Sequence, residues 1–134
     1  MAFADPERVS LDDGDAYADL PVLDREMLDE HILGDVEFLL ELVRVFTADS
    51  AATLAGIQAA LGAGDADGVE RGAHRLKGSL GALAALAAAD AARRLEATGK
   101  AGDLAAATHA WDVLQHELAR LRPELERATQ RRAD

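Results

Sequence analysis

Apolar residues recur at intervals of three and four along most of this chain, and that spacing limits the folds open to it. Residues spaced in this way lie on one side of an α-helix and form a strip that is buried against neighbouring elements. Alanine and leucine, which lose little conformational entropy on entering a helix, dominate the composition, whereas aromatic residues make up 4% of it. The chain is therefore expected to be built of helices. Two regular strips are Ala66, Val69, Ala73, Leu76, Leu80 and Leu83, and then Leu104, Ala107, Trp111, Leu114, Leu118, Leu121 and Leu125.

Aspartate and glycine residues mark where the helices are expected to begin and end. An aspartate side chain accepts hydrogen bonds from the free N–H groups of a first turn, and a glycine readily takes the left-handed conformation that ends a helix. A single helix over residues 66–98 would be about three times the mean length, so a break is expected near residues 83–86. Pro123 predicts a kink, or fraying after Arg122. The expected N-caps are Asp24, Asp35, Asp65 and Asp103, and the expected stops are Gly34, Gly62, Gly64 and Gly99.

Helices joined by short connections predict an all-α fold, an antiparallel up-down four-helix bundle with a short additional N-terminal helix. The 134 residues fit one domain. Residues 1–20 are acidic, contain Gly and Pro and lack sustained periodicity, so they are expected to form a flexible tail. The bundle is expected to occupy residues 21–126, followed by a solvated tail at residues 127–134.

Charge and composition exclude several classes of function. A formal net charge of −11 argues against nucleic-acid binding, which needs a basic surface to displace counterions. The chain has no cysteine, which rules out disulfides, thiolate catalysis and cysteine-based metal sites. No apolar run approaches the roughly 18 residues of a membrane-spanning helix, and the first residues lack the basic start and apolar core of a secretion signal. A cytoplasmic monomer that binds neither nucleic acid nor membrane is expected.

One face of the third expected helix carries an unusual set of polar residues and glycines. When the apolar strip of that helix is buried, Glu70, His74, Lys77, Gly78 and Gly81 share a neighbouring, outward face. His74 is therefore expected to be exposed, with Lys77 one turn above it. Each glycine lowers helix stability by roughly 1 kcal/mol relative to alanine, which suggests that another molecule approaches this face closely. The alternative is that the glycines admit a neighbouring helix of the same bundle.

An exposed imidazole beside a lysine is suited to accepting a phosphoryl group. A neutral imidazole is a competent nucleophile near pH 7, since its ordinary pKa is about 6.5. A phosphoryl group on His74 would lie within reach of the Lys77 ammonium, a point charge that suits phosphate oxygens. Arg71 and Arg75 flank the same turn and form a small basic island on an acidic protein. Glu70 is a candidate partner for the second ring nitrogen, and a simple surface ion pair one turn away explains it equally well.

The run His-Arg-Leu-Lys-Gly-Ser at residues 74–79 resembles the signature of histidine-containing phosphotransfer (HPt) domains, in which His-x-Leu-Lys-Gly-Ser/Ala surrounds the phosphorylated histidine. The resemblance extends over roughly residues 22–125, and the Leu-Glu pair at residues 95–96 lies at the spacing where family members carry such a pair on the following helix. The chain departs from the family at Ala84, where a glycine is common, and at Leu80, where a small residue is usual. Both departures concern the geometry of the turn between the third and fourth helices.

The resemblance implies a phosphorelay intermediate without kinase activity of its own. His74 is then expected to accept a phosphoryl group at Nε2 from an aspartyl phosphate on a response-regulator receiver domain and to pass it to another regulator. Lys77 is expected to stabilise the phosphoryl group. The implied partners are receiver domains and a hybrid histidine kinase; no cofactor or metal is expected on this chain, because the magnesium needed for transfer is held by the receiver. The residues expected to meet the partner are Glu70, Arg71, Arg75, Gly78 and Gly81.

The remaining histidines lack this context. His31 is expected to face the C-terminal carbonyls of the first helix. His109 and His116 lie on the side of the last helix away from its leucines, where a shared metal would need a third ligand. Two other functions stay open, namely the phosphoacceptor domain of a chemotaxis-type histidine kinase and a non-catalytic helical adaptor in which His74 is replaceable.

Overall fold

The structure of the protein is a computed structural model that describes residues 20–133, and within that range it contains helices and no strand. The expected all-α fold is confirmed. The flexible tail expected at residues 1–20 lies outside the described residues, apart from its last position. In chain order the helices are α3 (Arg25–Ile32), α4 (Val36–Ala63), α5 (Ala66–Ala82), α6 (Leu86–Ala101) and α7 (Leu104–Ala133).

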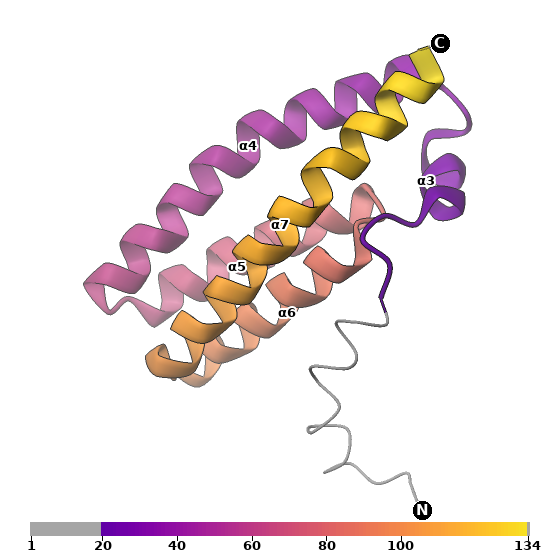
Figure 1. The fold of residues 1–134 in the computed structure, drawn as a ribbon. Coiled ribbons are helices and arrows are strands. Elements are labelled where there is room, and N and C mark those ends of the chain that lie inside the picture. Colours follow the sequence, from indigo (N-terminus) through magenta and orange to yellow (C-terminus); the bar gives the residue numbers. More distant parts are fainter. Residues whose placement is uncertain (1–19, 134) are drawn as a thin grey trace, which may run out of the picture.

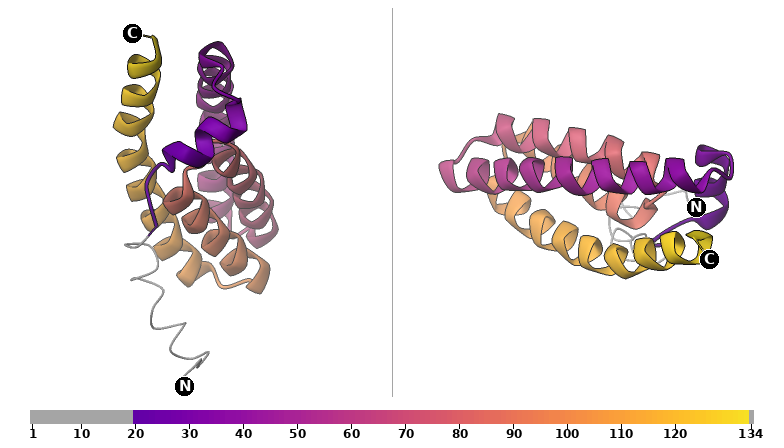
Figure 2. Two further views of the ribbon diagram at one scale, coloured as in Figure 1. Left: turned by 90° about the vertical axis from the view of Figure 1, so that its right-hand side faces the viewer. Right: turned by 90° about the horizontal axis from the view of Figure 1, so that it is seen from above.

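The four long helices run back and forth beside one another, as Figure 1 shows. Contact is most extensive between α5 and α6, followed by α6 with α7 and α4 with α5, while α4 and α7 touch each other less. The short α3 crosses one end of the long helices (Figure 2). Helix α5 is thus flanked by α4 and α6, and a side of it is left open to solvent.

The aspartates expected as N-caps begin α3, α4, α5 and α7. In each case a side-chain oxygen accepts a hydrogen bond from a backbone N–H of the first turn. Helix α4 ends where expected, with Gly64 in the left-handed conformation at φ 71°. Helix α6 continues past the expected stop at Gly99 and ends at Gly102, which has φ 72°. Gly99 has a packing role instead, described with the site below.

The break expected near residues 83–86 is confirmed, and the turn that makes it is buried. Residues 83–85 are inaccessible to solvent. Ala84 has φ 59°, in the left-handed region that costs an L-residue about 1–2 kcal/mol. The segment before α3 binds this turn: the N–H of Asp24 donates to the carbonyl of Ala84 at 2.9 Å, and the N–H of Ala87 donates to that of Pro21 at 3.0 Å.

Helix α7 is longer than the sequence predicts. Pro123 predicts a kink or fraying after Arg122, and a solvated tail from residue 127, whereas the helix continues to Ala133. Proline removes one hydrogen bond of the helix, but Leu125 and Ala128 beyond it are buried, and this burial offsets the loss. The bowed shape of α7 is visible in Figure 2.

The helical spacing of Met27, Leu28, Ile32 and Leu33 predicts one apolar side for the first helix. Leu33, however, is 89% exposed. The reason is that α3 ends at Ile32, and Leu33 itself takes the left-handed cap conformation at φ 54°. The core side of α3 consists of Leu28 and Ile32, both buried. The sequence therefore predicts the buried face of this helix correctly and extends it one residue too far.

Candidate functional site

His74 lies on the open side of α5. The apolar strip of this helix is buried, with Val69, Ala73, Leu76 and Leu80 at 1% exposure or less. That packing turns the neighbouring positions outward, so the side chain of His74 is 68% exposed. An imidazole placed in this way is open to a large partner.

A carboxylate from the next helix binds both His74 and Lys77. Nδ1 of His74 lies 2.8 Å from Oε2 of Glu96, and Nζ of Lys77 lies 2.7 Å from Oε1 of the same side chain. Glu96 is on α6, and its side chain is 19% exposed. The hydrogen bond from Lys77 lowers the pKa of Glu96 below its ordinary value of 4.5; burial opposes this effect, and the hydrogen bond from His74 adds to it. Near neutral pH, Glu96 is therefore ionised.

The ionised state of Glu96 fixes the tautomer of His74. A carboxylate has no proton to donate, so Nδ1 of the neutral ring carries the proton and donates it to Glu96. The lone pair then resides on Nε2, for which no hydrogen-bond partner exists among the described residues. A carboxylate on one ring nitrogen fixes the tautomer and orients the imidazole. The contact therefore prepares Nε2 as a nucleophile.

The carboxylate that binds the imidazole of His74 is that of Glu96. Glu70, the candidate on the same helix as His74, does not bind it. Glu70 instead lines a hollow of about 420 Å³ together with Arg71, His74 and Glu96. The close approach of α6 to α5 explains the difference. A Cβ added at Gly99 would lie 2.8 Å from the backbone nitrogen of Glu70, so only a glycine allows the helices to come this near. Glu96 lies one turn before Gly99 and reaches the ring from there.

The glycines of the molecule fall into two groups. Apart from its chain neighbours and the backbone of its own helix, a Cβ added at Gly78 or Gly81 would meet no atom of the described residues within 4 Å. The alternative that these two glycines admit a neighbouring helix is therefore excluded, and both expose bare backbone beside Lys77. A Cβ added at Gly72, by contrast, would lie 2.5 Å from Cγ1 of Ile57 on α4. Gly72 and Gly99 serve packing, while Gly78 and Gly81 leave a flat strip on the surface.

Arg71 and Arg75 are exposed and line a groove of about 770 Å³ between α4 and α5. Neither guanidinium has an ion pair or hydrogen bond with a residue in the described range. Other arginines of the molecule are paired, for example Arg93 with Asp90 at 2.8 Å. The basic island predicted beside His74 is therefore made of two cations that have no partner among residues 20–133.

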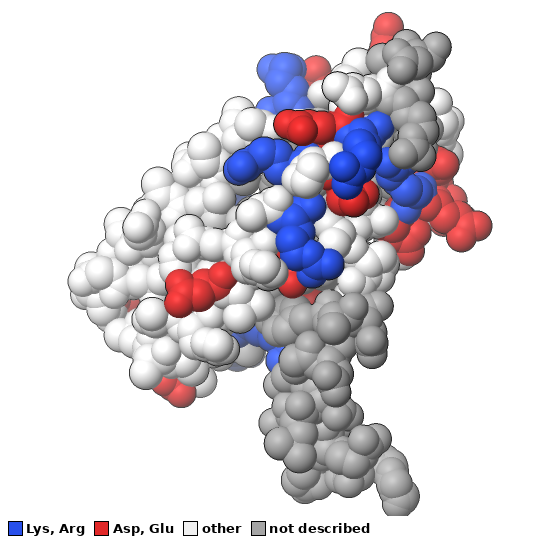
Figure 3. Space-filling model, in the orientation of Figure 1, with Lys and Arg blue, Asp and Glu red and all other residues white. Residues whose placement is uncertain are grey.

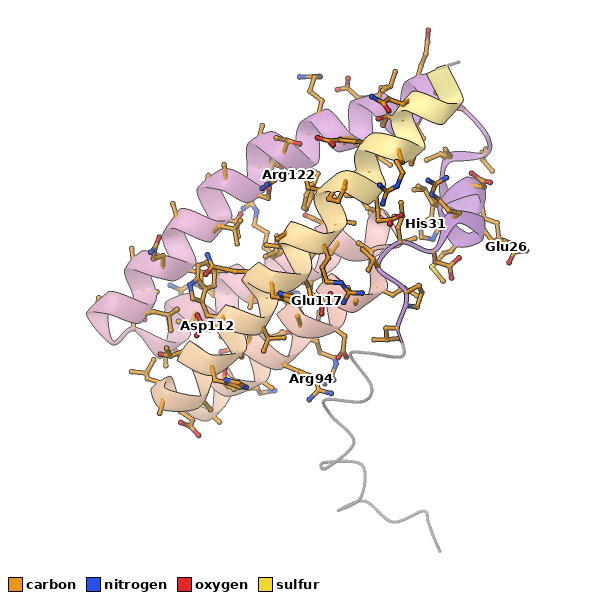
Figure 4. All side chains as sticks on the ribbon, in the orientation of Figure 1. Glu26, His31, Arg94, Asp112, Glu117 and Arg122 are labelled. Atoms are coloured by element: carbon orange, nitrogen blue, oxygen red, sulfur yellow. The ribbon has the colours of Figure 1, made fainter. Side chains whose placement is uncertain are left out.

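The other histidines lie on other helices. Nδ1 of His31 on α3 (Figure 4) is 3.0 Å from the carbonyl oxygen of Ala82 at the end of α5, so it binds a neighbouring helix rather than the end of its own. His109 and His116 are exposed on α7. Across residues 20–133 no group of three or more His, Asp or Glu side chains is arranged to hold a metal ion. None of the helices described is both long and apolar enough to cross a membrane.

This fold with an exposed histidine belongs to a known class, the histidine phosphotransfer modules. The sequence model of the Hpt domain matches residues 41–124. Among solved structures, the chain is similar to the crystal structure of histidine-containing phosphotransfer protein B (HptB) from Pseudomonas aeruginosa PAO1. The TM-score is 0.77, the sequence identity is 29%, and the match covers 83% of this chain and 96% of that chain. No curated protein gives a significant match.

The chain belongs to the Hpt domain family. It is a histidine phosphotransfer intermediate of two-component phosphorelays, and proteins of this family are carriers rather than kinases. The family resemblance of residues 74–79 is thereby confirmed. The matched segment extends from α4 to α7 and contains His74, Lys77 and Glu96.

Glu96 is the residue of the site to which sequence reasoning assigns no role. The family spacing identifies the Leu-Glu pair, but spacing does not tell which carboxylate reaches a ring 22 positions away. A usable signal lies in α6 itself. Ala91, Ala92 and Leu95 form its buried strip, and the next position, Glu96, lies at the edge of that strip, beside the neighbouring helix.

Proposed function

We propose that this protein relays phosphoryl groups through Nε2 of His74, accepting them from the aspartyl phosphate of one receiver domain and passing them to another response regulator. The observation that carries the proposal is the double contact of Glu96, whose carboxylate binds the nucleophilic ring and a phosphate-binding cation together. We assign the scaffold as an antiparallel up-down four-helix bundle of α4–α7 with α3 as an additional helix. The domain begins near residue 21 and, because Ala128 is buried, extends past residue 126 along α7.

Transfer requires a free nitrogen lone pair in line with the phosphorus atom. Nε2 attacks the phosphorus, the N–P bond forms, the bond from phosphorus to the aspartate oxygen breaks, and the aspartate leaves as a carboxylate. The ring keeps its Nδ1 proton and gains positive charge. The carboxylate of Glu96, 2.8 Å from Nδ1, stabilises that charge as it develops. The same steps in reverse deliver the phosphoryl group to the second receiver.

Lys77 supplies the positive charge for the phosphoryl oxygens. Its Nζ is bound to Glu96 at 2.7 Å, and its side chain is 35% exposed, so the ammonium group is held close to His74 before any phosphoryl group arrives. A phosphoryl group carries about two negative charges near pH 7 and competes with Glu96 for this ammonium group. Lys77 therefore reaches the transition state without a large loss of side-chain entropy.

The partner meets the molecule on the open side of α5. Gly78 and Gly81 let the receiver approach the ring, and Glu70, Arg71 and Arg75 form the rim of that contact. Magnesium belongs to the receiver in this scheme, and this chain supplies no metal ligand to the transfer. The partners are receiver domains and a hybrid histidine kinase, and the cytoplasm is the compartment that we propose for all of them.

The test is phosphorylation by a receiver. Purified protein is mixed with a phosphorylated receiver domain and magnesium, and intact mass is measured for the wild type, for His74→Gln and for His109→Gln, which removes an exposed imidazole from α7. We expect one acid-labile phosphoryl group on the wild type and on His109→Gln, and none on His74→Gln. A phosphoryl group on His74→Gln would overturn the assignment of the acceptor.

The two open alternatives predict different outcomes of the same experiment. Labelling of His74 by an ATP-binding kinase domain, with no transfer from any of several phosphorylated receivers, would favour the phosphoacceptor domain of a chemotaxis-type kinase. No labelling by either donor, with all variants folded by circular dichroism, would favour an adaptor.

A further inference from the structure

The two flanks of His74 differ in charge. On the side of α6, Glu96 pairs with both His74 and Lys77, so positive and negative charge offset each other there. On the side of α4, the guanidinium groups of Arg71 and Arg75 are exposed and have no counter-charge within ion-pair distance in the described part of the chain. The positive charge beside the ring is therefore concentrated on one flank.

The wall opposite these arginines does not neutralise them. Helix α4 contains no charged residue between positions 50 and 63. Figure 3 shows the side of α4 that faces the viewer, along the left edge, and that side is mostly uncharged. Two carboxylates line the groove, Asp49 at one end and Asp65 at the other. Asp65 caps the start of α5, where its Oδ1 accepts the N–H of Gly68 at 3.0 Å, and it keeps its negative charge. Among the described residues neither carboxylate forms an ion pair with Arg71 or Arg75. The groove thus has an excess of positive charge on its α5 side.

The groove is shallow and apolar at its base. It is lined largely by small side chains and glycines, so a helix of another protein can lie close to the backbones of α4 and α5. It is also continuous with the reactive site, because Arg71 lines both this groove and the hollow that contains His74. The small residues that form the base are Ala52, Gly56, Ala59, Ala60 and Gly72.

We propose that Arg71 and Arg75 select receiver partners that carry acidic side chains on a helix lying in the α4–α5 groove. This inference rests on the proposed function, since it assumes that a receiver meets His74, and it adds the direction of approach and the charge of the partner. The two arginines lie four residues apart and so project from the same side of α5. Carboxylates one turn apart on the partner helix match this spacing, and each guanidinium binds a carboxylate through two N–H groups.

The overall charge of the protein makes this local attraction selective. A net charge of −11 repels an acidic partner at long range, but at physiological ionic strength charges are screened beyond about 8 Å. At contact distance the arginines dominate, so an acidic partner is stabilised in one orientation only. A partner with a basic helix places like charges opposite Arg71 and Arg75, which disfavours the complex.

The experiment compares receiver domains grouped by the charge of the helix beside their phosphorylated aspartate. Transfer rates and the dissociation constants of the unphosphorylated receivers are measured for the wild type and for the double variant Arg71→Glu/Arg75→Glu. Arg122→Glu is the matched control: Arg122 is an exposed arginine of α7 (Figure 4) that lines a different hollow, between α4 and α7. The double variant Arg71→Lys/Arg75→Lys keeps the positive charge and removes the bidentate hydrogen bonding of the guanidinium groups.

With the wild type, we expect receivers that carry an acidic helix to react faster and to bind more tightly than receivers that carry a basic helix. The glutamate double variant should lose at least about tenfold in the second-order transfer rate and in affinity, with a smaller change in the first-order rate at saturating receiver. This loss should shrink between about 50 mM and about 500 mM salt. The transfer rate and affinity of the lysine double variant should lie between those of the wild type and those of the glutamate double variant. Arg122→Glu should match the wild type in both.

Two results separate this inference from the proposed function. Transfer to His74 that is unchanged in the glutamate variant at low salt, within about twofold, would overturn the selection by Arg71 and Arg75 and leave the relay intact. Binding that depends on the two arginines without any transfer to His74 would support the docking surface and overturn the relay. If receivers of both charge groups fail to bind and to react, the inference and the proposed function are both overturned.

Discussion

Glu96 divides its two oxygens between an imidazole and an ammonium group, so the state of one partner affects the other. With Nδ1 of His74 on one oxygen and Nζ of Lys77 on the other, the carboxylate orients the nucleophile and positions the phosphate-binding charge. Removing the charge while keeping the shape of the side chain tests both effects together. Two predictions at the residue scale follow from this arrangement.

The first concerns the tautomer. Glu96→Gln replaces an acceptor-only group by an amide that donates as well as accepts, so the proton of His74 is no longer confined to Nδ1. We expect ¹⁵N NMR to show a mixture of tautomers, and transfer from a phospho-receiver to slow by about tenfold, equivalent to about 1.4 kcal/mol. Glu124→Gln, which breaks an exposed pair on α7, is the control. A single Nδ1–H tautomer in Glu96→Gln would contradict the assigned role.

The second concerns pH. Because the pKa of Glu96 is lower in the folded protein than its ordinary value of 4.5, the unfolded chain takes up the proton first as the solution is acidified. The stabilisation is therefore complete above pH 4.5 and is lost as the pH falls through the lowered pKa. We expect the difference in free energy of unfolding between the wild type and Glu96→Gln to shrink across that window. Urea titrations from pH 6 downward would show this, and a constant difference would contradict it.

At the scale of the helix, the structure distinguishes glycines that pack closely against a neighbouring helix from glycines that contact no other helix. Gly99 lies against the backbone of α5, whereas Gly78 faces open space on the surface of the same helix pair. The helical spacing of α5 predicts that Gly78 faces outward, but the sequence predicts Gly99 as a helix stop and does not reveal its packing against α5. Stability measurements are expected to distinguish them.

Gly78→Ala should raise the free energy of unfolding by about 0.5–1 kcal/mol, because alanine loses less backbone entropy in a helix and no atom blocks its Cβ. Transfer should slow at the same time, since the added methyl group stands on the face that we propose meets the receiver. Gly99→Ala should lower stability by about 1–3 kcal/mol, because its Cβ meets the backbone at 2.8 Å. Urea unfolding measures both. A destabilised Gly78→Ala would contradict the distinction.

The turn between α5 and α6 offers a second test at this scale. Ala84→Gly removes a strain of about 1–2 kcal/mol at φ 59° and adds a backbone entropy cost of about 0.5–1 kcal/mol. We expect stability to stay equal or to rise by up to about 1.5 kcal/mol. Ala88→Gly, an equally buried alanine within α6, should lose about 1 kcal/mol. Equal losses in the two variants would show that Ala84 is not strained.

The helices and their caps were predictable because each rests on local chemistry. The apolar spacing of α5 and the aspartates before four of the helices determine those elements without reference to the rest of the chain. The residue that orients His74 was not predictable in this way. Its identity depends on how closely α6 approaches α5, which is decided at Gly99 by a contact between helices. Likewise, Pro123 predicts a kink or fraying after Arg122, whereas the helix continues past it with Leu125 and Ala128 buried.

At the scale of the whole molecule, the large exposed hydrophobic residues in the described range all lie between positions 33 and 45, but they do not share one side of the chain. The large exposed hydrophobic residues on α4 are Phe38, Leu40 and Val45, and Leu40 projects from the side of the helix opposite to Phe38, since two positions correspond to about 200°. They do not form one continuous patch of the kind that drives stable association. We expect a monomer of 14.2 kDa by light scattering at micromolar concentrations. A dimer whose mass falls on Phe38→Ser would contradict this.

The exposure of His74 affects which receivers can exchange a phosphoryl group with this protein. A group bound to a ring that is 68% open to water is available to every receiver that diffuses to it. In the proposed relay His74 is the one phosphorylated site of the described residues, so each copy stores one phosphoryl group. The number of copies in a cell then sets how much signal the relay holds, and the relative abundance of the receivers sets where it flows. Such a protein holds a fixed number of phosphoryl groups, and receiver domains load and unload them in proportion to their abundance.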